Sequence, residues 1–263
     1  MDFSFIIINY RTLELTQQCL NSIFSHCLNN SFEIILIDNS SEDGSIEALE
    51  KKFGDRVKII KNSSNLGFAK ANNQGAKIAQ GKHLFFLNSD TQLKKDILPT
   101  LKDVFIQNPN FGILSPQLLT PELQPQDGAH GRFPTLFNLL TRKSRENWKE
   151  EVNSSLWQTD WVSGAALVIR KSIFNETNGW DENFFLYFED VDLCFRANSK
   201  IGVCPEISVI HYSGSSLKQS RKRKLYYYKS QNYFFKKQYG LTYSLLMRLI
   251  RWPYKLYSCY LRK

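Results

Sequence analysis

Three carboxylates near residue 190 have the spacing and surroundings of acid–base groups. Glu189, Asp190 and Asp192 directly follow the apolar, aromatic run at residues 184–188. Bulky apolar neighbours exclude water from a carboxylate and raise its proton affinity, which suits a general base. The structural alternative is that these acids cap the first turn of a helix and form an ion pair with Arg196.

Two further aspartates stand where predicted strands end in polar turns. Asp38 opens the turn at residues 38–45, and Asp90 ends the Asn-Ser-Asp sequence at residues 88–90. The first carboxylate could accept hydrogen bonds from a nucleoside, and the second could bind a divalent cation as a hard oxygen ligand. Either turn alone could be an ordinary Asx turn, because Asp and Asn favour turns in general.

Alternating strands and helices are expected to bring these turns together. Short, continuous apolar runs predict four buried strands, at residues 3–9, 32–37, 57–61 and 83–87. Helices that end near Leu28, Phe53 and Ala79 separate them. Strands that alternate with helices imply a parallel, right-handed, doubly wound sheet. Ligands of such sheets bind at the carboxyl ends of the strands, which is where Asp38 and Asp90 stand.

Several classes of protein lack support in the sequence. No Gly-x-Gly-x-x-Gly follows the first strand and no Walker loop is present, so we expect no dinucleotide cofactor. No apolar stretch approaches the ~20 residues of a membrane-spanning helix, and the first residues lack the basic segment of a signal peptide. The five cysteines have no zinc-binding spacing, and we expect reduced thiols in a cytosolic protein.

The net charge of +9 is unevenly distributed along the chain. No Asp or Glu follows Glu206, and residues 218–263 contain 13 Lys or Arg, whereas the remainder has 21 basic and 25 acidic residues. A basic tail on a mildly acidic body indicates an anionic partner surface, either membrane lipid or nucleic acid. We therefore expect a catalytic domain at residues 1–217 and a basic, aromatic-rich helical tail at residues 218–263.

Four motifs, in this order, resemble those of family 2 glycosyltransferases with the GT-A fold. They are Asp-Asn-Ser-Ser-x-Asp-Gly-Ser at 38–45, Asn-Leu-Gly-Phe-Ala-x-Ala-Asn-Asn-x-Gly at 65–75, Leu-Asn-Ser-Asp-Thr at 87–91, and the acid-rich segment at 179–194. The rhamnosyltransferase-like branch is the most similar, and the resemblance extends from about residue 3 to about residue 240. It implies an α/β protein with a Rossmann-like, mixed, mainly parallel sheet flanked by helices, to which the tail adds a basic helical appendage.

The resemblance also implies an enzyme, an inverting and metal-dependent glycosyltransferase. By motif, the catalytic base is Asp190, the metal ligands are Asp90 and His211, and the donor-binding residues are Tyr10, Asp38, Asn65, Asn72 and Asn88. Inversion is one direct displacement, in which the acceptor hydroxyl loses its proton to a base. A bound Mg²⁺ or Mn²⁺ would offset the charge of the leaving diphosphate, and a histidine ligand favours Mn²⁺. Without the resemblance, His211 would be interpreted as an ordinary strand histidine.

The acceptor is expected to face the least regular part of the chain, residues 116–160, where prolines break long elements. Two elements are predicted around it, a helix over residues 131–140 and a strand over residues 160–169. In the resembling branch this insert faces the acceptor, so Arg132 would meet an acceptor phosphate. Trp180 would stack on an acceptor sugar, with Glu189 also on the acceptor side. The alternatives are a solvated loop arginine and a core tryptophan.

Residues 245–261 combine a basic stripe with an apolar one. Arg248, Arg251 and Lys255 fall on one helical face, and Leu246, Leu249, Ile250, Pro253, Leu256, Tyr257 and Tyr260 fall near another. This pattern suits a helix in the membrane interface, with Trp252 at the depth of the headgroups. The alternative is a terminal helix that packs on its own domain.

The function expected from all of these features is sugar transfer in the synthesis of a bacterial surface polysaccharide such as O-antigen. The expected donor is dTDP-rhamnose and the expected acceptor is a lipid-linked saccharide. The enzyme would be cytoplasmic and peripheral to the inner face of the cell membrane, bound to anionic lipid and not to nucleic acid. Four alternatives stay open: a UDP-hexose donor, a nucleic-acid-binding protein that uses the basic tail, a nucleotidyltransferase, and an inactive scaffold with the same fold.

Overall fold

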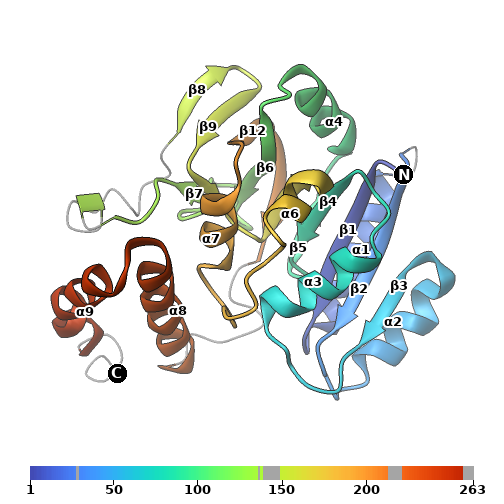
Figure 1. The fold of residues 1–263 in the computed structure, drawn as a ribbon. Coiled ribbons are helices and arrows are strands. Elements are labelled where there is room, and N and C mark those ends of the chain that lie inside the picture. Colours follow the sequence, from blue (N-terminus) through green and yellow to red (C-terminus); the bar gives the residue numbers. More distant parts are fainter. Residues whose placement is uncertain (28–29, 136, 139–148, 213–220, 257–263) are drawn as a thin grey trace.

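The computed structural model describes residues 1–27, 30–135, 137–138, 149–212 and 221–256. One large sheet runs through the body, with helices on both of its faces and a helical hairpin at the C-terminal end (Figure 1). The strands are β1 (Phe3–Asn9), β2 (Phe32–Asp38), β3 (Lys58–Lys61), β4 (His83–Leu87), β5 (Thr91–Leu93), β6 (Phe111–Leu119), β7 (His130–Gly131), β8 (Glu150–Asn153), β9 (Leu156–Thr159), β10 (Trp161–Val162), β11 (Ala166–Arg170) and β12 (Lys200–His211).

The four predicted strands of the N-terminal half are confirmed and are parallel. They lie in the order β3-β2-β1-β4, and the sheet continues through β11, β6, β12, β9 and β8. The second half makes the sheet mixed, because β11 is antiparallel to both β4 and β6, whereas β12 is parallel to β6. The expected mixed, mainly parallel sheet is thus confirmed, and the simpler all-parallel sheet is wrong beyond β4.

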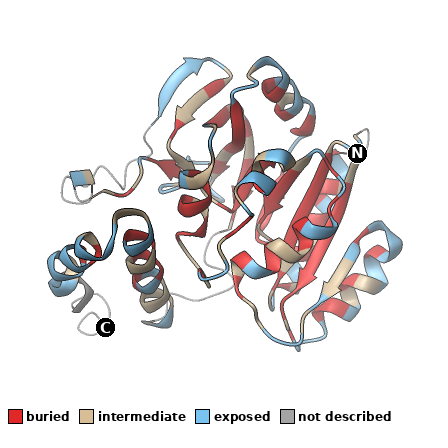
Figure 2. Cartoon of the chain, viewed as in Figure 1, coloured by how far each residue is buried: buried red, intermediate tan, exposed pale blue. Residues whose placement is uncertain are grey.

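The sheet is buried on both faces because its central strands carry apolar residues at consecutive positions, as in Phe5–Ile8 of β1. In β1, Phe5 and Ile7 face one core cluster while Ile6 faces the other, and all three side chains are fully buried. Burying a side chain of this size contributes about 1.5–3 kcal/mol. Figure 2 shows these buried strands between helices that are exposed only on their outer sides.

The helices divide between the two core clusters. They are α1 (Leu13–His26), α2 (Ser45–Phe53), the 3₁₀ turn η1 (Gly54–Arg56), α3 (Phe68–Ile78), α4 (Leu98–Gln107), α6 (Lys171–Glu176), α7 (Glu189–Arg196), α8 (Arg221–Tyr239) and α9 (Leu241–Leu256). α1, α2 and α4 contribute to the first cluster, and α3, α6 and α7 to the second. α8 and α9 share a third, aromatic cluster with the segment before α7.

Two predicted elements in the middle of the chain need correction. The single strand expected at residues 160–169 is two strands, β10 and β11, because a turn at Gly164–Ala165 interrupts it. The helix expected at residues 131–140 begins instead with the strand β7 at Gly131; residues 132–135 are not helical, residues 137–138 are helical, and residues 136, 139 and 140 lie outside the described residues. The boundary expected at residue 217/218 also lies outside them.

The described cysteines agree with the expectation of reduced thiols. Cys19, Cys27, Cys194 and Cys204 are free and buried. Burial raises the pKa of the Cys19 thiol to about 12, so this thiol is protonated at neutral pH. Within the described part of the chain, no helix has the length and apolarity required to cross a bilayer.

Candidate active site

Asp38 lies at the carboxyl end of β2, beside the end of β1. The Asn9 amide donates to Asp38 Oδ1 over 2.8 Å, and the Ser41 hydroxyl donates to the same oxygen over 2.5 Å. The second oxygen accepts from the Ser41 N–H over 3.2 Å. Asp38 is only 5% exposed, so these bonds fix its carboxylate at the edge of the sheet.

A chain of hydrogen bonds joins this corner to the turn that carries Asp90. The Thr12 hydroxyl donates to Asn9 Oδ1 over 3.2 Å and lies 3.1 Å from the Ser89 hydroxyl. Ser89 precedes Asp90 in the turn between β4 and β5. The two predicted aspartate turns are therefore neighbours at one edge of the sheet, as the parallel arrangement of β1, β2 and β4 requires.

Asp90 and His211 come together although 120 residues separate them in the chain. β5 follows Asp90 and pairs with the end of β12, so that Thr91 stands opposite His211. Asp90 Oδ1 is 3.2 Å from His211 Nε2, and both side chains are less than 10% exposed. Asn88 Nδ2 is 3.4 Å from the same ring nitrogen. The structure thus groups three of the predicted donor and metal residues.

Gln126 orients the imidazole of His211. Its amide oxygen lies 3.0 Å from Nδ1, a contact that suits the tautomer with the hydrogen on Nδ1 and the lone pair on Nε2. Two electron-rich atoms, Asp90 Oδ1 and His211 Nε2, then face one another at close range, an arrangement that favours a cation between them. The described residues contain no group of three or more acidic, histidine or cysteine ligands. A divalent ion fits this pair if substrate oxygens or water complete its coordination.

The donor loop, residues 65–68, is shaped by its own amides. Asn65 Oδ1 accepts from the Gly67 N–H over 2.9 Å and from the Asn39 amide over 3.0 Å. Gly67 has φ +82°, and the loop then enters α3, where Asn72 is 2% exposed with an amide nitrogen that has no hydrogen-bond partner. Asn65 therefore supports the loop, whereas Asn72 is a buried donor beneath it.

Asp190 stands in the first turn of α7, and its carboxylate is held by backbone groups. Gly164 N–H donates to Oδ2 over 3.0 Å and Val191 N–H donates to Oδ1 over 2.8 Å. Burial raises the pKa of Asp190, and the two N–H groups oppose that rise. Gly164 directly precedes Ala165, whose carbonyl accepts from the Asn88 N–H, so Asp190 is connected to the Asn-Ser-Asp turn through one short segment.

The other two acids of the cluster have different environments. Glu189 is 5% exposed with one oxygen unpartnered, and burial, with the charge of Asp190, raises its pKa well above the ordinary value. Asp192 is fully buried and accepts from Arg196 over 2.7 Å, the ion pair of the structural alternative. The acid cluster therefore divides into a buried carboxyl group with one unpartnered oxygen, a carboxylate held by backbone N–H groups and a structural ion pair.

The residues expected on the acceptor side are not brought together. Trp180 is 2% exposed and packs edge-on against Phe68 and Phe86, so neither ring face is available to a sugar. This placement is the core alternative. Arg132 is exposed beside β7, and Glu189 is buried beneath the surface. Tyr10 is half-buried after β1 with Arg11 over its ring, next to the Asp38 corner.

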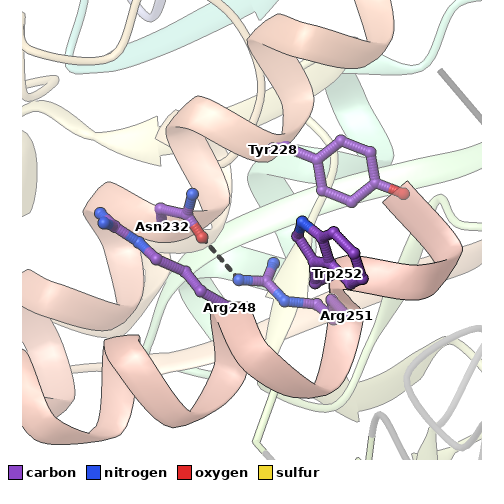
Figure 3. A pocket seen from close by; sticks show the side chains of 5 residues that line it. All are labelled: Tyr228, Asn232, Arg248, Arg251 and Trp252. Carbon is purple, nitrogen blue, oxygen red and sulfur yellow. Dashed lines mark hydrogen bonds between the residues drawn. The ribbon is translucent and has the colours of Figure 1, made fainter. Parts of the chain in front are cut away.

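The C-terminal hairpin encloses a separate pocket of about 240 Å³ (Figure 3). Its lining side chains are Tyr228, Asn232, Arg248, Arg251 and Trp252. Arg251 turns inward and donates to Asn232 and Gln231, so it does not share a solvated stripe with Arg248 as the helical pattern suggested. Burial lowers the pKa of Arg251 to about 10, and the charge of Arg248 contributes to that shift.

Sequence reasoning missed three residues that shape this site. Asn9 could have been found from the sequence, because it is a polar residue at the carboxyl end of an apolar strand. No sequence pattern marked Gln126, because it lies in the irregular segment and contacts His211 only in the folded protein. Lys237 lies in the basic tail, whose charges were expected to meet an anionic surface, yet it bonds Asp181 and Asp192.

Comparison with known proteins decides the family. Residues 4–177 match the model of Glycosyl transferase family 2. The chain belongs to this family. The matched residues of this glycosyltransferase include Asp38 and Asp90, whereas Asp190 and His211 follow the match.

Similar proteins include transferases of hexose and rhamnose. The Low-salt glycan biosynthesis hexosyltransferase Agl10 of Haloferax volcanii is 27% identical over 80% of this chain and 67% of its own length. The N-acetylglucosaminyl-diphospho-decaprenol L-rhamnosyltransferase of Mycobacterium tuberculosis is 28% identical over 70% of this chain and 67% of its own. Rhamnosyltransferase WbbL of Escherichia coli K12 is 30% identical over 51% and 54%. The chain is thus a family 2 glycosyltransferase with hexosyl- and rhamnosyltransferase relatives.

Solved structures share the fold. GalNAc-T7, crystallised with UDP, GalNAc and Mn²⁺, superposes with a TM-score of 0.64 at 15% identity, over 80% of this chain and 44% of its own. S. aureus TarS in complex with UDP-GlcNAc superposes with a TM-score of 0.61 at 17% identity, over 89% and 65%. The expected GT-A fold is confirmed.

Proposed function

We propose that this glycosyltransferase moves a sugar from a nucleoside diphosphate to a lipid-linked saccharide with inversion at the anomeric carbon. The observation that carries the proposal is the placement of Asp190. Its carboxylate is fixed by two backbone N–H groups and has a raised pKa, and the segment Gly164–Ala165 links it to the turn that carries Asp90. A positioned carboxylate whose pKa is shifted toward neutrality suits a general base.

Asp190 would take the proton of the acceptor hydroxyl as that oxygen attacks the anomeric carbon. The new C–O bond forms while the bond from that carbon to the diphosphate breaks, and the diphosphate leaves on the opposite face. Hydrogen bonds that fix Asp190 before the reaction reduce the cost of orienting it, as positioning effects require. Asp38, with Tyr10 beside it, would bind the nucleoside, and Asn65, Asn72 and Asn88 would line the rest of the donor site.

Asp90 and His211 would hold Mg²⁺ or Mn²⁺, with Gln126 orienting the histidine. The pair fits such an ion, since a carboxylate oxygen and the lone pair of an imidazole nitrogen face one another at 3.2 Å. When bound, the ion would supply charge stabilisation for the diphosphate. Mn²⁺ in GalNAc-T7, which shares the fold, supports a divalent ion here, and the imidazole ligand favours Mn²⁺.

The donor sugar is proposed from the relatives. Two of them carry rhamnosyltransferase in their names, which supports L-rhamnose as the transferred sugar. We propose its dTDP form as the donor. The name of Agl10 and the UDP-GlcNAc bound to TarS support a UDP-hexose as the second candidate. The decaprenol in the name of the mycobacterial relative supports a lipid-linked acceptor.

A lipid-linked acceptor requires access to a membrane surface, for which α9 is suited. Leu241, Leu245, Leu249 and Trp252 form one exposed row along it, with exposures of 57%, 47%, 73% and 63%. Arg248, which is exposed beside that row, could meet lipid phosphates, whereas Arg251 is held by Asn232 and Gln231. We propose that α9 lies in the membrane interface, at the inner face of the cell membrane, with the acidic body in the cytoplasm.

The test is a donor panel with purified protein. Nucleoside diphosphate release and sugar transfer would be measured from dTDP-rhamnose and UDP-hexoses, with Mn²⁺ or Mg²⁺ and after chelation. Release from dTDP-rhamnose that requires the ion supports the full proposal. Release from a UDP-hexose instead keeps the mechanism and replaces the donor. Failure to bind or turn over any nucleotide sugar would reject the enzyme and leave a scaffold.

A further inference from the structure

The acid loop, residues 181–190, carries Asp190 and lies between two other parts of the chain. On one side it meets the donor loop, where the Phe68 N–H donates to the Phe185 carbonyl over 2.9 Å. On its other side lies α8, in the basic tail (Figure 1). The loop that holds the candidate base is therefore placed partly by a helix beyond the matched family residues 4–177.

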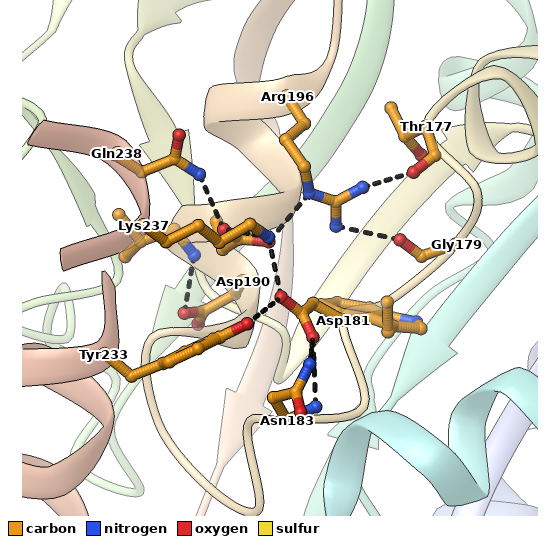
Figure 4. A network of polar contacts seen from close by, with 12 residues as sticks. Thr177, Gly179, Asp181, Asn183, Asp190, Arg196, Tyr233, Lys237 and Gln238 are labelled. Atoms are coloured by element: carbon orange, nitrogen blue, oxygen red, sulfur yellow. Dashed lines mark hydrogen bonds and ion pairs between the residues drawn. The ribbon is translucent and has the colours of Figure 1, made fainter. Parts of the chain in front are cut away.

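α8 binds both flanks of the acid loop through one lysine (Figure 4). Lys237 Nζ is 2.7 Å from Asp181 Oδ2, at the start of the loop, and 2.8 Å from Asp192 Oδ1, just after its end. The side chain of Lys237 is 26% exposed, and those of Asp181 and Asp192 are 13% and 0% exposed. Removing the cation would leave the buried Asp192 with Arg196 as its nearest countercharge, which weakens the junction.

Neighbouring residues of α8 complete the attachment. Tyr233 donates to Asp181 over 3.0 Å, Gln238 donates to Asp192 over 2.8 Å, and Ser230 donates to the Leu186 carbonyl over 2.8 Å. Burial raises the pKa of Asp181, but hydrogen bonds from Lys237 and Asn183 outweigh burial and bring it to about 2. Asp181 is therefore a charged partner throughout the range in which the enzyme would work.

The acid loop needs such support because its backbone is strained. Tyr187 and Phe188 have φ values of +70° and +68°, a region that side chains disfavour, and they directly precede α7. Strained residues persist only where the surroundings over-determine them. Phe188 packs on Phe234 of α8 with ring centroids 5.5 Å apart, and Arg223 donates to the Tyr187 hydroxyl. Contacts from α8 thus hold the strained turn that aims Asp190.

We infer that α8 is a positioning element for Asp190, with Lys237 as its central positioning residue. Lys237 touches no reacting atom in the proposed mechanism; it fixes the two carboxylates that bracket the acid loop. The inference rests on the proposed function of Asp190. It predicts that loss of this cation lowers the rate of the chemical step, because a displaced base costs rate even when substrate binding is intact.

The experiment compares Lys237→Met with Lys236→Met in the full chain. Lys236 is the neighbouring exposed lysine of α8, so the pair separates position from loss of charge. We expect kcat to fall about 10- to 100-fold in Lys237→Met with donor KM changed less than about threefold, and to remain at the wild-type value in Lys236→Met. Lys237→Arg should restore part of kcat, because it returns the cation.

Amide hydrogen exchange gives a readout that does not depend on activity. Amides of residues 182–191 should exchange faster in Lys237→Met than in Lys236→Met, while those of β1 and β4 stay protected in both. If Lys237→Met loses the fold, Tyr233→Phe removes one bond to Asp181 and should show the same pattern more weakly. Equal exchange and equal kcat in the two lysine variants would overturn the inference. A wild-type protein without turnover would instead reject the proposed function, and exchange alone would then decide whether α8 holds the loop.

Discussion

At the scale of single residues, Asp190 combines two properties that oppose each other. Burial raises its pKa, whereas the N–H groups of Gly164 and Val191 stabilise its charged form. The result is a carboxylate that is fixed in direction and still a better proton acceptor than an exposed aspartate. Glu189 beside it has only burial and the charge of Asp190, and its pKa rises further. Two neighbouring carboxyl groups therefore differ because only Asp190 is stabilised by the N–H groups of Gly164 and Val191.

Replacing Asp190 by Asn should lower kcat by about 10²- to 10⁴-fold, since general bases contribute rate factors of that size. Donor binding, measured by calorimetry, should be retained. Asp103→Asn on α4, an exposed carboxylate of the same type, is the control and should leave kcat unchanged. Unchanged turnover in Asp190→Asn would move the base to another residue.

The activity of the wild-type enzyme should have an acid limb set by Asp190. A base works deprotonated, and burial raises its pKa above the ordinary value of 3.8, so kcat/KM should fall as the pH drops through that raised value. The measurement is the pH dependence of kcat/KM at saturating metal. A limb at or below 3.8 would show that Asp190 is solvated like a surface aspartate in the working enzyme.

Gln126 should matter for metal affinity. Gln126→Leu removes the acceptor that fixes His211, and loss of such a partner typically weakens metal binding by about 10- to 100-fold. Mn²⁺ titration in the presence of nucleoside diphosphate, followed by calorimetry, measures the effect. Gln124→Leu, two residues away and exposed, should bind Mn²⁺ as the wild type does. The same affinity in both variants would remove Gln126 from the site.

At the scale of elements, the donor loop and the acid loop support each other. A Cβ at Gly67 would lie 2.7 Å from the Phe185 carbonyl oxygen, and its φ of +82° is a region that other residues rarely adopt. Gly128 also has positive φ, at +68°, but a Cβ there would meet nothing within 4 Å. Replacing either glycine would therefore strain the backbone, but only a side chain at Gly67 would also clash with Phe185.

Gly67→Ala should therefore destabilise the protein more than Gly128→Ala. The control should cost about 1–2 kcal/mol for its left-handed backbone, and Gly67→Ala should add the cost of separating the two loops. Urea unfolding of both variants measures the difference in the free energy of unfolding. Gly67→Ala should also lower kcat, since the acid loop must move; equal unfolding free energies would contradict the predicted contact.

At the scale of the whole molecule, the two helices of the C-terminal hairpin have different surroundings: α8 packs on the body of the protein and α9 exposes an apolar row. The inner side of α8 packs on the acid loop through Phe234, and Phe235 packs against Tyr243 of α9; both phenylalanines are fully buried. Leu249 and Trp252 of α9 are exposed. Ser244 and Met247 join α9 to α8 on the side between them. A membrane contact made by α9 would therefore lie one helix away from the segment that carries the base.

Binding to anionic vesicles tests the outward face. Leu249→Asp should reduce co-sedimentation with phosphatidylglycerol vesicles at least tenfold, because it places a charge in the apolar row and repels the lipid headgroups. Ile106→Asp is the matched control, as Ile106 is 68% exposed on α4. Binding of the wild type should weaken with salt and with neutral phosphatidylcholine. Equal binding of the two variants would exclude α9 as the membrane contact.

The local sequence determined the elements of the N-terminal half and the residues at their ends. Continuous apolar runs specify buried strands, and the polar turns after parallel strands lie at the same edge of the sheet. Asp38 and Asp90 could therefore be placed at that edge from the sequence. Motif resemblance supplied Asp190 and His211 as candidates, and the structure brings His211 to Asp90 through the pairing of β5 with β12.

Only the tertiary structure decided which polar groups meet across long separations. Gln126 reaches His211 over 85 residues, and Lys237 reaches Asp192 over 45. Neither contact leaves a periodic signal, because one lies in an irregular loop and the other in a helix whose charges appear uniformly solvated. The sequence also could not decide the role of Trp180, because an aromatic residue beside a motif can either contact a ligand or pack in the core. In the structure, Trp180 packs in the core against Phe68, Phe86 and Phe174. Sequence patterns report local periodicity, whereas these contacts depend on how distant segments pack.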